Sequence, residues 1–298
     1  MEIRPLSPSW HSHVSGIGVL FLCHQPSADQ LAFYSQFTNY GYTVQVIVDD
    51  STWPVPDVPG LQILSISDED SIISGFLGVN PAIRKPLPVS AWDKALYAIH
   101  HSSQSQAYYW LIEDDVFISS PESLVCLDRI HQSADLLTAS STLLTPDKLK
   151  PSSHDGWLWF QNIPQRLLPK PWAHGMVCAV RLSSRLAAES AQLVQRHATA
   201  LEARNRQRRR IASAFARCHV PWSWLKRVER PSYLFIEYLF HTLALHHQLE
   251  VGTPDQLSTI LWRHSWDLES MLPTHLYHPV KAIADHQRLR EQIARRQP

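Results

Sequence analysis

Three consecutive carboxylates stand at one point of this sequence, directly after a run of aromatic and aliphatic residues. The run covers residues 108–112, and the acids are Glu113, Asp114 and Asp115. Adjacent negative charges repel one another, so a cation is expected to offset them. The usual candidate is a hard divalent metal that takes oxygen ligands and binds substrate phosphates. An acidic turn solvated by water is the alternative.

Acidic side chains suited to such a site also occur in two further segments. Asp49 and Asp50 close a second apolar, β-branched run, as the triple acid closes the first. Glu237 lies inside residues 234–240, whose other members are all apolar or aromatic. A carboxylate in such surroundings is seldom left unpaired, and its pKa is expected to be raised. Glu237 is therefore a candidate general base for a hydroxyl near neutral pH.

Alternating strand and helix patterns surround the acids of the first half. Residues 16–23 and 42–48 predict buried strands, and residues 29–39 predict a helix between them. Ser27 stands three residues before a Gln, the spacing of a capping box, and Gly41 marks the end of the helix. This unit has the length of a parallel crossover. It predicts an α/β protein with a Rossmann-type, mostly parallel open sheet flanked by helices.

The remaining segments continue the alternation less regularly. Strands are predicted at 61–66, 108–112, 135–139, 176–182 and 249–251, and helices at 90–101, from 183 or 184 onward, at 231–245 and at 282–298. Residues 143–171 predict a loop region containing Pro and Trp. Neither a repeat nor a linker interrupts the chain, which predicts a single domain over residues 1–298.

Composition narrows the classes of function. Lys plus Arg and Asp plus Glu both number 27, so no overall charge attracts the protein to nucleic acid or to an anionic membrane. The N-terminus has no apolar signal core, and the longest apolar runs are far below the ~20 residues of a membrane span. A cytoplasmic protein, with a possible peripheral contact to the membrane, is the simplest expectation.

The four cysteines form no C-x-x-C pair, which disfavours a structural zinc site. They are Cys23, Cys126, Cys178 and Cys218. Three of them lie in apolar contexts typical of core residues. Unpaired core cysteines suit a reducing compartment.

One segment departs from the neutral balance of the chain. Residues 201–230 contain nine Lys or Arg against two Glu, and the Arg-rich part spans residues 204–230. A solvated helix face is one interpretation. Contact with an anionic acceptor, lipid headgroups or RNA is the other.

Together these features resemble the GT-A-fold glycosyltransferases, which use nucleotide-sugar donors. Four motifs carry the resemblance, in the order of that family. Glu113-Asp114-Asp115 resembles a variant of its D-x-D motif, and His174-Gly175-Met176 resembles its glycine loop near the donor sugar. Glu237 is similar to the late acid that serves as catalytic base or acceptor contact, and His278 to the C-terminal metal-binding histidine.

The resemblance implies a metal site. Asp115 is expected to bind Mn²⁺ or Mg²⁺ directly, and His278 to complete the site as a neutral imidazole. Glu113 and Asp114 are expected to contact the ribose or metal-bound water. Such a metal neutralises the charge that develops on a departing nucleoside diphosphate.

The resemblance also implies contacts with the nucleotide sugar. Asp49 and Asp50 are expected to accept hydrogen bonds from the base or ribose, and Gly175 to lie near the sugar. Lys281 is expected to add positive charge beside the diphosphate. The sequence departs from the commonest form of the family at Ser51, where a Gly often follows the acids.

Lys94 is a further candidate contact. It follows Asp93 at the start of the helix predicted over residues 90–101, which could border the nucleotide. An exposed ion pair on the helix is the equal alternative. On this scheme residues 10–118 bind the nucleotide, residues 119–281 bind the donor sugar and acceptor, and residues 282–298 form a helical tail.

The activity implied is transfer of a sugar, most simply from a UDP-sugar, to a hydroxyl of a glycan or lipid-linked acceptor, with Glu237 as base. Inversion and retention both remain open. A nucleotidyltransferase is a rival, but residues 24–27 lack the Gly-rich, basic phosphate loop of that class. A binding protein that kept the fold without activity is another. Nucleic-acid binding is not expected as the main role, because the net charge is zero.

Overall fold

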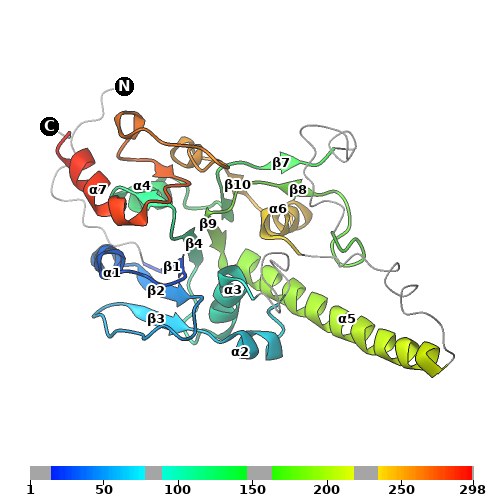
Figure 1. The fold of residues 1–298 in the computed structure, drawn as a ribbon. Coiled ribbons are helices and arrows are strands. Elements are labelled where there is room, and N and C mark those ends of the chain that lie inside the picture. The colour runs from blue at the N-terminus through cyan, green and yellow to red at the C-terminus, as the bar shows by residue number, and fades with distance from the viewer. Residues whose placement is uncertain (1–14, 78–88, 146–162, 218–233, 297–298) are drawn as a thin grey trace.

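The computed structural model describes residues 15–77, 89–145, 163–217 and 234–296. A seven-stranded sheet forms its centre, with the order β10-β6-β9-β4-β1-β2-β3 (Figure 1). The strands are β1 (Ile17–Cys23), β2 (Thr43–Val48), β3 (Gln62–Ser65), β4 (Tyr108–Glu113), β6 (Leu136–Leu137), β9 (Ala179–Ser183) and β10 (Val251–Gly252). Only β9 runs against its neighbours in this sheet. The predicted α/β class with a mostly parallel sheet is confirmed.

Helices flank the sheet, and short strands form two further pairs. The helices are α1 (Ala28–Ser35), α2 (Asp68–Ile73), α3 (Ala91–His101), α4 (Glu122–Ile130), α5 (Ser184–Arg217), α6 (Ile236–His246) and α7 (His286–Ala294). The 3-10 helices are η1 (Gln36–Tyr40), η4 (Asp255–Leu257), η5 (Leu268–Ser270) and η6 (Ile283–Asp285). The small antiparallel pairs are β5 (Phe117–Ile118) with β11 (Leu276–Tyr277), and β7 (Thr142–Leu143) with β8 (Ala173–His174).

The first crossover forms as its local sequence predicts. Ser27 and Gln30 make the reciprocal capping box at the start of α1. Gly41 ends η1 with φ of +90°, a conformation in which a side chain would clash with the backbone. The chain then enters β2, which pairs in parallel with β1.

The order of the strands reverses at β1. The chain moves outward from β1 to β2 and β3, then returns to place β4 on the opposite side of β1. β4 also pairs in parallel with β1, so both strands end at the same edge. In open α/β sheets, ligands bind in the crevice at such a reversal, outside the carboxyl ends of the strands.

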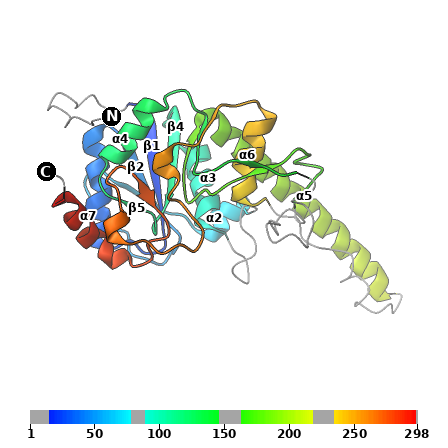
Figure 2. The ribbon, with the colours of Figure 1, turned by 90° about the horizontal axis from the view of Figure 1, so that it is seen from above.

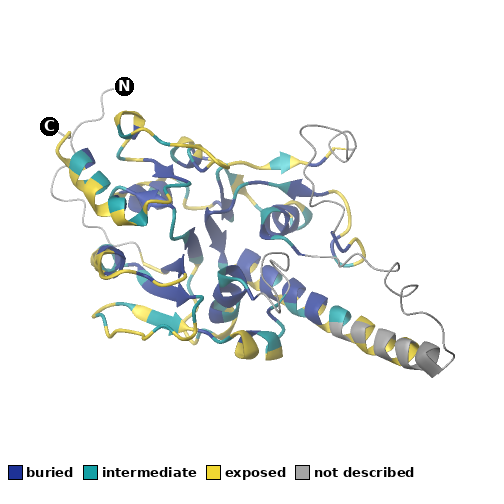
Figure 3. Ribbon diagram, in the orientation of Figure 1, coloured by how far each residue is buried: buried dark blue, intermediate teal, exposed yellow. Residues whose placement is uncertain are grey.

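Alternation along the strands divides the core into two layers. Leu20 and Leu111 point to the layer that contains α3, α5 and α6, whereas Phe21 and Trp110 point to the layer that contains α1 and α4. Both faces of the central strands are buried (Figure 3). Covered strands with continuous apolar sequences are the usual form of parallel sheets.

A buried ion pair lies within the layer of α1 and α4. Arg181 of β9 places Nη1 2.5 Å from Oδ1 of Asp128 of α4. Trp110 Nε1 donates to the same carboxylate at 3.1 Å, and the Tyr42 hydroxyl donates at 2.5 Å. Arg181 also donates to the carbonyls of His131 and Ala134. Two donors and two acceptors from other parts of the chain therefore support this buried charge pair, although Arg181 Nε has no hydrogen-bond partner among the described residues.

Helix α5 is 34 residues long and extends beyond the rest of the fold (Figure 1). Its first half packs against α3 and α6 and buries Leu186, Ala191 and Val194. Farther along, Arg204 and Arg210 are exposed. Of the Arg-rich segment 204–230, residues 218–230 lie outside the described part of the chain. Among the described helices, none is both long and apolar enough to cross a bilayer.

The C-terminal segment returns to the sheet. Helix α7 lies on the side of α1 and α4 (Figures 1 and 2). Arg290 of α7 stacks over the Phe33 ring at 3.4 Å and donates to the Ile118 carbonyl at 3.0 Å. Burial lowers the pKa of Arg290 to about 10, and the guanidinium remains charged at neutral pH. These contacts hold the end of the chain beside β5.

Candidate metal and nucleotide site

Antiparallel pairing brings Cys178 opposite the first acid of the triple. β4 pairs with β9 so that Ile112 faces Ala179, and one position farther the Glu113 N–H donates to the Cys178 carbonyl at 2.9 Å. Cys178 therefore lies in the acidic site, by which we mean the group of side chains around Glu113, Asp114 and Asp115. Its interpretation as a core residue is incomplete, because its side chain is buried but faces carboxylates.

A second pairing delivers His278 to the same place from the far end of the chain. β11 pairs antiparallel with β5, and the Val280 N–H donates to the Asp115 carbonyl at 2.8 Å. His278 stands between these two contacts. Its Nε2 lies 3.4 Å from Asp115 Oδ1 and 3.9 Å from Glu113 Oε2.

The other ring nitrogen of His278 defines the state of the imidazole. Nδ1 lies 2.8 Å from the Leu261 carbonyl oxygen, which can only accept, so Nδ1 carries a proton. Nε2 of a neutral ring then directs a lone pair at the oxygens of Asp115 and Glu113. Lone pairs facing one another require a positive charge between them, either a proton on Nε2 or a metal ion.

The pKa of His278 reflects this environment. Burial acts to lower the pKa, but the hydrogen bond and charge of Asp115, with the charge of Glu113, outweigh it and raise the pKa above its usual range. The carboxylates thus attract a cation to Nε2. A divalent metal with carboxylate and imidazole ligands fits this donor set.

Asp114 lies beside the carboxyl ends of β1 and β4. Its N–H donates to the Leu22 carbonyl at 3.1 Å, beside the end of β1. Burial and the charges of Asp115 and Glu113 raise its pKa to about 6. A carboxyl with this pKa is well placed to exchange a hydrogen bond with a ligand at the reversal of the sheet.

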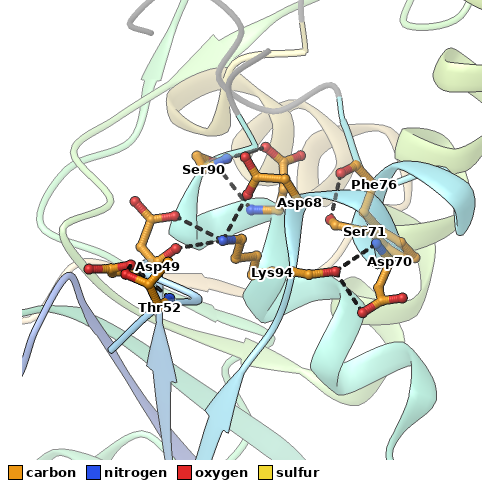
Figure 4. A network of polar contacts seen from close by, with 11 residues as sticks. Asp49, Thr52, Asp68, Asp70, Ser71, Phe76, Ser90 and Lys94 are labelled. Carbon is orange, nitrogen blue, oxygen red and sulfur yellow. Dashed lines mark hydrogen bonds and ion pairs between the residues drawn. The ribbon is translucent and has the colours of Figure 1, made fainter. Parts of the chain in front are cut away.

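Lys94 is fully buried, and its ammonium group holds the end of β2 (Figure 4). It donates to the Asp49 carbonyl at 2.7 Å and lies 3.2 Å from Asp49 Oδ1 and 2.9 Å from Asp68 Oδ1. Asp93 is also fully buried and caps α3 by accepting from Ser90. The alternative of an exposed helical ion pair between Asp93 and Lys94 is therefore wrong, because the start of α3 lies against the sheet edge.

Asp50 faces solvent beside the same edge. It accepts from the Thr52 N–H at 2.9 Å, from the Thr52 hydroxyl at 2.7 Å and from Gln25 Nε2 at 2.6 Å. The hydrogen bonds of Thr52 and Gln25 lower its pKa to about 2, so the side chain is ionised. The Asp50 N–H donates to His24, which places it next to the end of β1.

The first turn of α3 connects the two acidic groups. Trp92 Nε1 donates to Glu113 Oε1 at 2.8 Å, and two residues later Lys94 holds Asp49. Neither Trp92 nor Asp68 was predicted from sequence to act at the site. Trp92 was recognisable only as an apolar residue of an amphipathic helix, and its indole N–H gave no signal.

Glu237 lies in the first turn of α6 and is partly exposed. Its carbonyl accepts from the Gly175 N–H at 3.0 Å. Its charge is one of those that, together with burial and Glu113, raise the pKa of the Cys178 thiol far above its usual range. Glu237 is therefore near Cys178 and the candidate metal ligands around it. Lys281 is exposed and follows Val280, whose N–H contacts Asp115.

Gly175 occupies a position with no room for a side chain. A Cβ there would lie 1.9 Å from the Ser140 carbonyl oxygen and 2.5 Å from His241 Nε2. The His241 ring is held by the Ser140 carbonyl at 3.0 Å, and burial lowers its pKa to about 4. The glycine thus permits α6 and β8 to approach each other beside Glu237.

Gly175→Ala is expected to destabilise the protein by about 2 kcal/mol or more, since the clash is with backbone and cannot be relieved by rotating a side chain. Urea unfolding measures the change. Gly18→Ala is the control, because its added Cβ would lie 3.2 Å from the side-chain ring of Tyr109 and would not meet backbone. If wild type and Gly175→Ala are equally stable, the Ser140 carbonyl can move away from residue 175 without cost.

The structure brings together Glu113, Asp114, Asp115 and His278, and places Cys178 and Glu237 beside them. Asp49, Asp50 and Lys94 lie at the neighbouring strand ends. Comparisons of the sequence with protein-family models and with curated proteins give no match. The function is therefore inferred from the site itself.

Proposed function

We propose that this protein is a metal-dependent glycosyltransferase that moves a sugar from a nucleotide-sugar donor, a UDP-sugar in the first instance, to a hydroxyl of a glycan or lipid-linked acceptor. One observation supports it most strongly. His278 Nε2 faces Asp115 Oδ1 at 3.4 Å and Glu113 Oε2 at 3.9 Å, directly outside the strand reversal where α/β sheets bind nucleotides.

The donor set fits a divalent metal. Asp115 and His278 are the proposed ligands, with Mn²⁺ or Mg²⁺ as the ion. Such an ion neutralises charge on a departing diphosphate. In this chain the Leu261 carbonyl keeps Nδ1 protonated and leaves Nε2 as the ligand atom. Trp92 holds Glu113 from the other side.

The strand ends supply the nucleotide contacts in this proposal. Asp114 lies beside the carboxyl ends of β1 and β4, and Asp49 and Asp50 lie at the end of β2. Lys94 positions Asp49 through its backbone and side chain, so it acts on the nucleotide through that residue. Lys281, which is exposed three residues after His278, supplies positive charge toward the diphosphate in this proposal.

Glu237 is the proposed base. It is partly exposed in the first turn of α6, and the Gly175 N–H fixes its backbone. A carboxylate there can accept the proton of an acceptor hydroxyl while that oxygen attacks the sugar. Direct displacement by this route inverts the anomeric carbon.

The site of action is proposed to be the cytoplasm. Cys23, Cys126 and Cys178 are free thiols, as expected in a reducing compartment. The Arg-rich segment 204–230, of which Arg204 and Arg210 are exposed on α5, is proposed to touch an anionic membrane surface near a lipid-linked acceptor.

Metal-dependent nucleotide binding tests the proposal. Calorimetry is expected to detect UDP binding with Mn²⁺ present and none with a chelator. Asp115→Asn is expected to remove the Mn²⁺-dependent part, because one carboxylate ligand is lost. Asp255→Asn, an exposed acid in η4 away from the triple, is the matched control. If UDP binds equally well without Mn²⁺ and to the Asp115→Asn variant, the metal assignment is wrong.

The donor is then identified by hydrolysis of a panel of nucleotide sugars with Mn²⁺. A nucleotidyltransferase would instead release pyrophosphate from a nucleoside triphosphate and a sugar phosphate. An inactive binding protein would bind UDP and hydrolyse no donor. These readouts separate the three functions.

A further inference from the structure

The acidic site contains a thiol whose position the proposed transferase does not use. One carboxylate oxygen of Glu113, Sγ of Cys178 and Nε2 of His278 all lie within 4.8 Å of one another. Cys178 and His278 are buried, and Glu113 is partly exposed. Three different ligand types therefore converge from β4, from the start of β9 and from the segment after β11.

Two of these side chains, Glu113 and His278, are each oriented by a second contact. Trp92 Nε1 donates to Glu113 Oε1 at 2.8 Å and leaves Oε2 to face His278. The Leu261 carbonyl accepts from His278 Nδ1 at 2.8 Å and leaves Nε2 as the ligand atom. Such outer contacts are typical of built metal sites, where they set ring orientation and tautomer.

We propose that Glu113, Cys178 and His278 form a binding site for Zn²⁺, with a fourth position open to water or substrate. Zinc takes thiolate, imidazole and carboxylate ligands in tetrahedral geometry, with bonds of about 2.0 to 2.3 Å. Ligand atoms in such a site lie about 3.5 Å apart, so closure by roughly 1 Å completes it. Mg²⁺ prefers oxygen ligands and gains little from the thiol.

Zn²⁺ bound in this site competes with the Mn²⁺ or Mg²⁺ of the proposed reaction. His278 belongs to both donor sets, so one ion excludes the other. Zn²⁺ stands above Mn²⁺ in affinity for mixed nitrogen, oxygen and sulfur sites. Zn²⁺ is therefore an inhibitor that displaces Mn²⁺. The inhibition rests on the proposed function, whereas zinc binding does not.

Cobalt titration tests the site, because Co²⁺ replaces Zn²⁺ and reports on sulfur ligation. Wild-type protein is expected to give a near-ultraviolet thiolate-to-cobalt charge-transfer band at one equivalent, and Zn²⁺ to abolish it. Cys178→Ser is expected to lose the band. Cys126→Ser, which changes an exposed thiol on α4, is the matched control and is expected to keep it.

The positions of the other ligands are tested in the same titration. His278→Ala is expected to weaken Co²⁺ binding at least tenfold. Trp92→Phe removes the hydrogen bond to Glu113 and part of a buried ring that packs near Phe240, so it is expected to weaken binding about tenfold and keep the sulfur band. If Trp92→Phe leaves the affinity unchanged, Glu113 is not a ligand.

Thiol alkylation followed by mass spectrometry covers the case in which Cys178→Ser fails to fold. In the wild type, Zn²⁺ is expected to protect Cys178 and not Cys126. A wild type with no band, a band that persists in Cys178→Ser, or equal alkylation of Cys178 with and without Zn²⁺ would each overturn the zinc site. Mn²⁺-dependent UDP binding is measured separately, so loss of either result leaves the other interpretable.

Discussion

Glu237→Gln is expected to lower the rate of sugar transfer by about 10²- to 10⁴-fold, the range of a general base. The amide cannot take a proton from the acceptor hydroxyl, but its size and its backbone contact with Gly175 stay the same. Binding of UDP with Mn²⁺ is therefore expected to remain within a few-fold of wild type. Transfer is measured with the donor identified by the hydrolysis panel.

Glu250→Gln is the matched control, because Glu250 lies just before β10, where its side chain contacts Ser133. It is expected to leave transfer unchanged. A Glu237→Gln variant that transfers sugar within a few-fold of wild type would show that Glu237 is a structural acid. The base would then have to be another group near α6.

Arg181→Met is expected to destabilise the protein by about 3–5 kcal/mol. Arg181 is fully buried, and its removal leaves the Asp128 carboxylate without its cation. The remaining donors, Trp110 and Tyr42, cannot neutralise the charge. Urea unfolding followed by circular dichroism gives the free energy of unfolding.

Two comparisons separate loss of the cation from a simple change of size. The double variant Asp128→Leu with Arg181→Met removes both charges and is expected to recover much of the loss. Arg288→Met breaks the exposed pair with Asp285, whose atoms lie 3.1 Å apart, and is expected to change stability by less than about 1 kcal/mol. Equal effects of Arg181→Met and Arg288→Met would contradict a structural role for the buried pair.

The parts of the fold that depend on local sequence were predictable. The capping box at Ser27, the turn at Gly41 and the strands around them follow from residues that are neighbours in the chain. The acids at the end of β4 could also be recognised, because three adjacent carboxylates are themselves a signal. The residues that lie around these acids in the folded protein could not be recognised in the same way, because they are distant in the sequence.

Cys178, which was missed, and Lys94, whose role was left open, reach the site through contacts with residues distant in the sequence. Cys178 lies opposite Glu113 only because β9 inserts antiparallel beside β4, and strand direction is not encoded in an apolar run. Lys94 was expected on an exposed helix face as one alternative, but contact with the end of β2 buries it. The strand predicted over residues 176–182 runs instead from Ala179 to Ser183.

The pairing of β5 with β11 has a consequence for how the protein is made. The contact of the Ser119 hydroxyl with the Pro273 carbonyl, beside this pair, joins residues 154 apart in sequence. Contacts between residues so distant in sequence form late in folding, because a long loop must first close. A nascent chain that ends before β11 presents the three acids without His278. The proposed metal site can therefore be complete only after residue 278 has been synthesised and β11 has paired with β5.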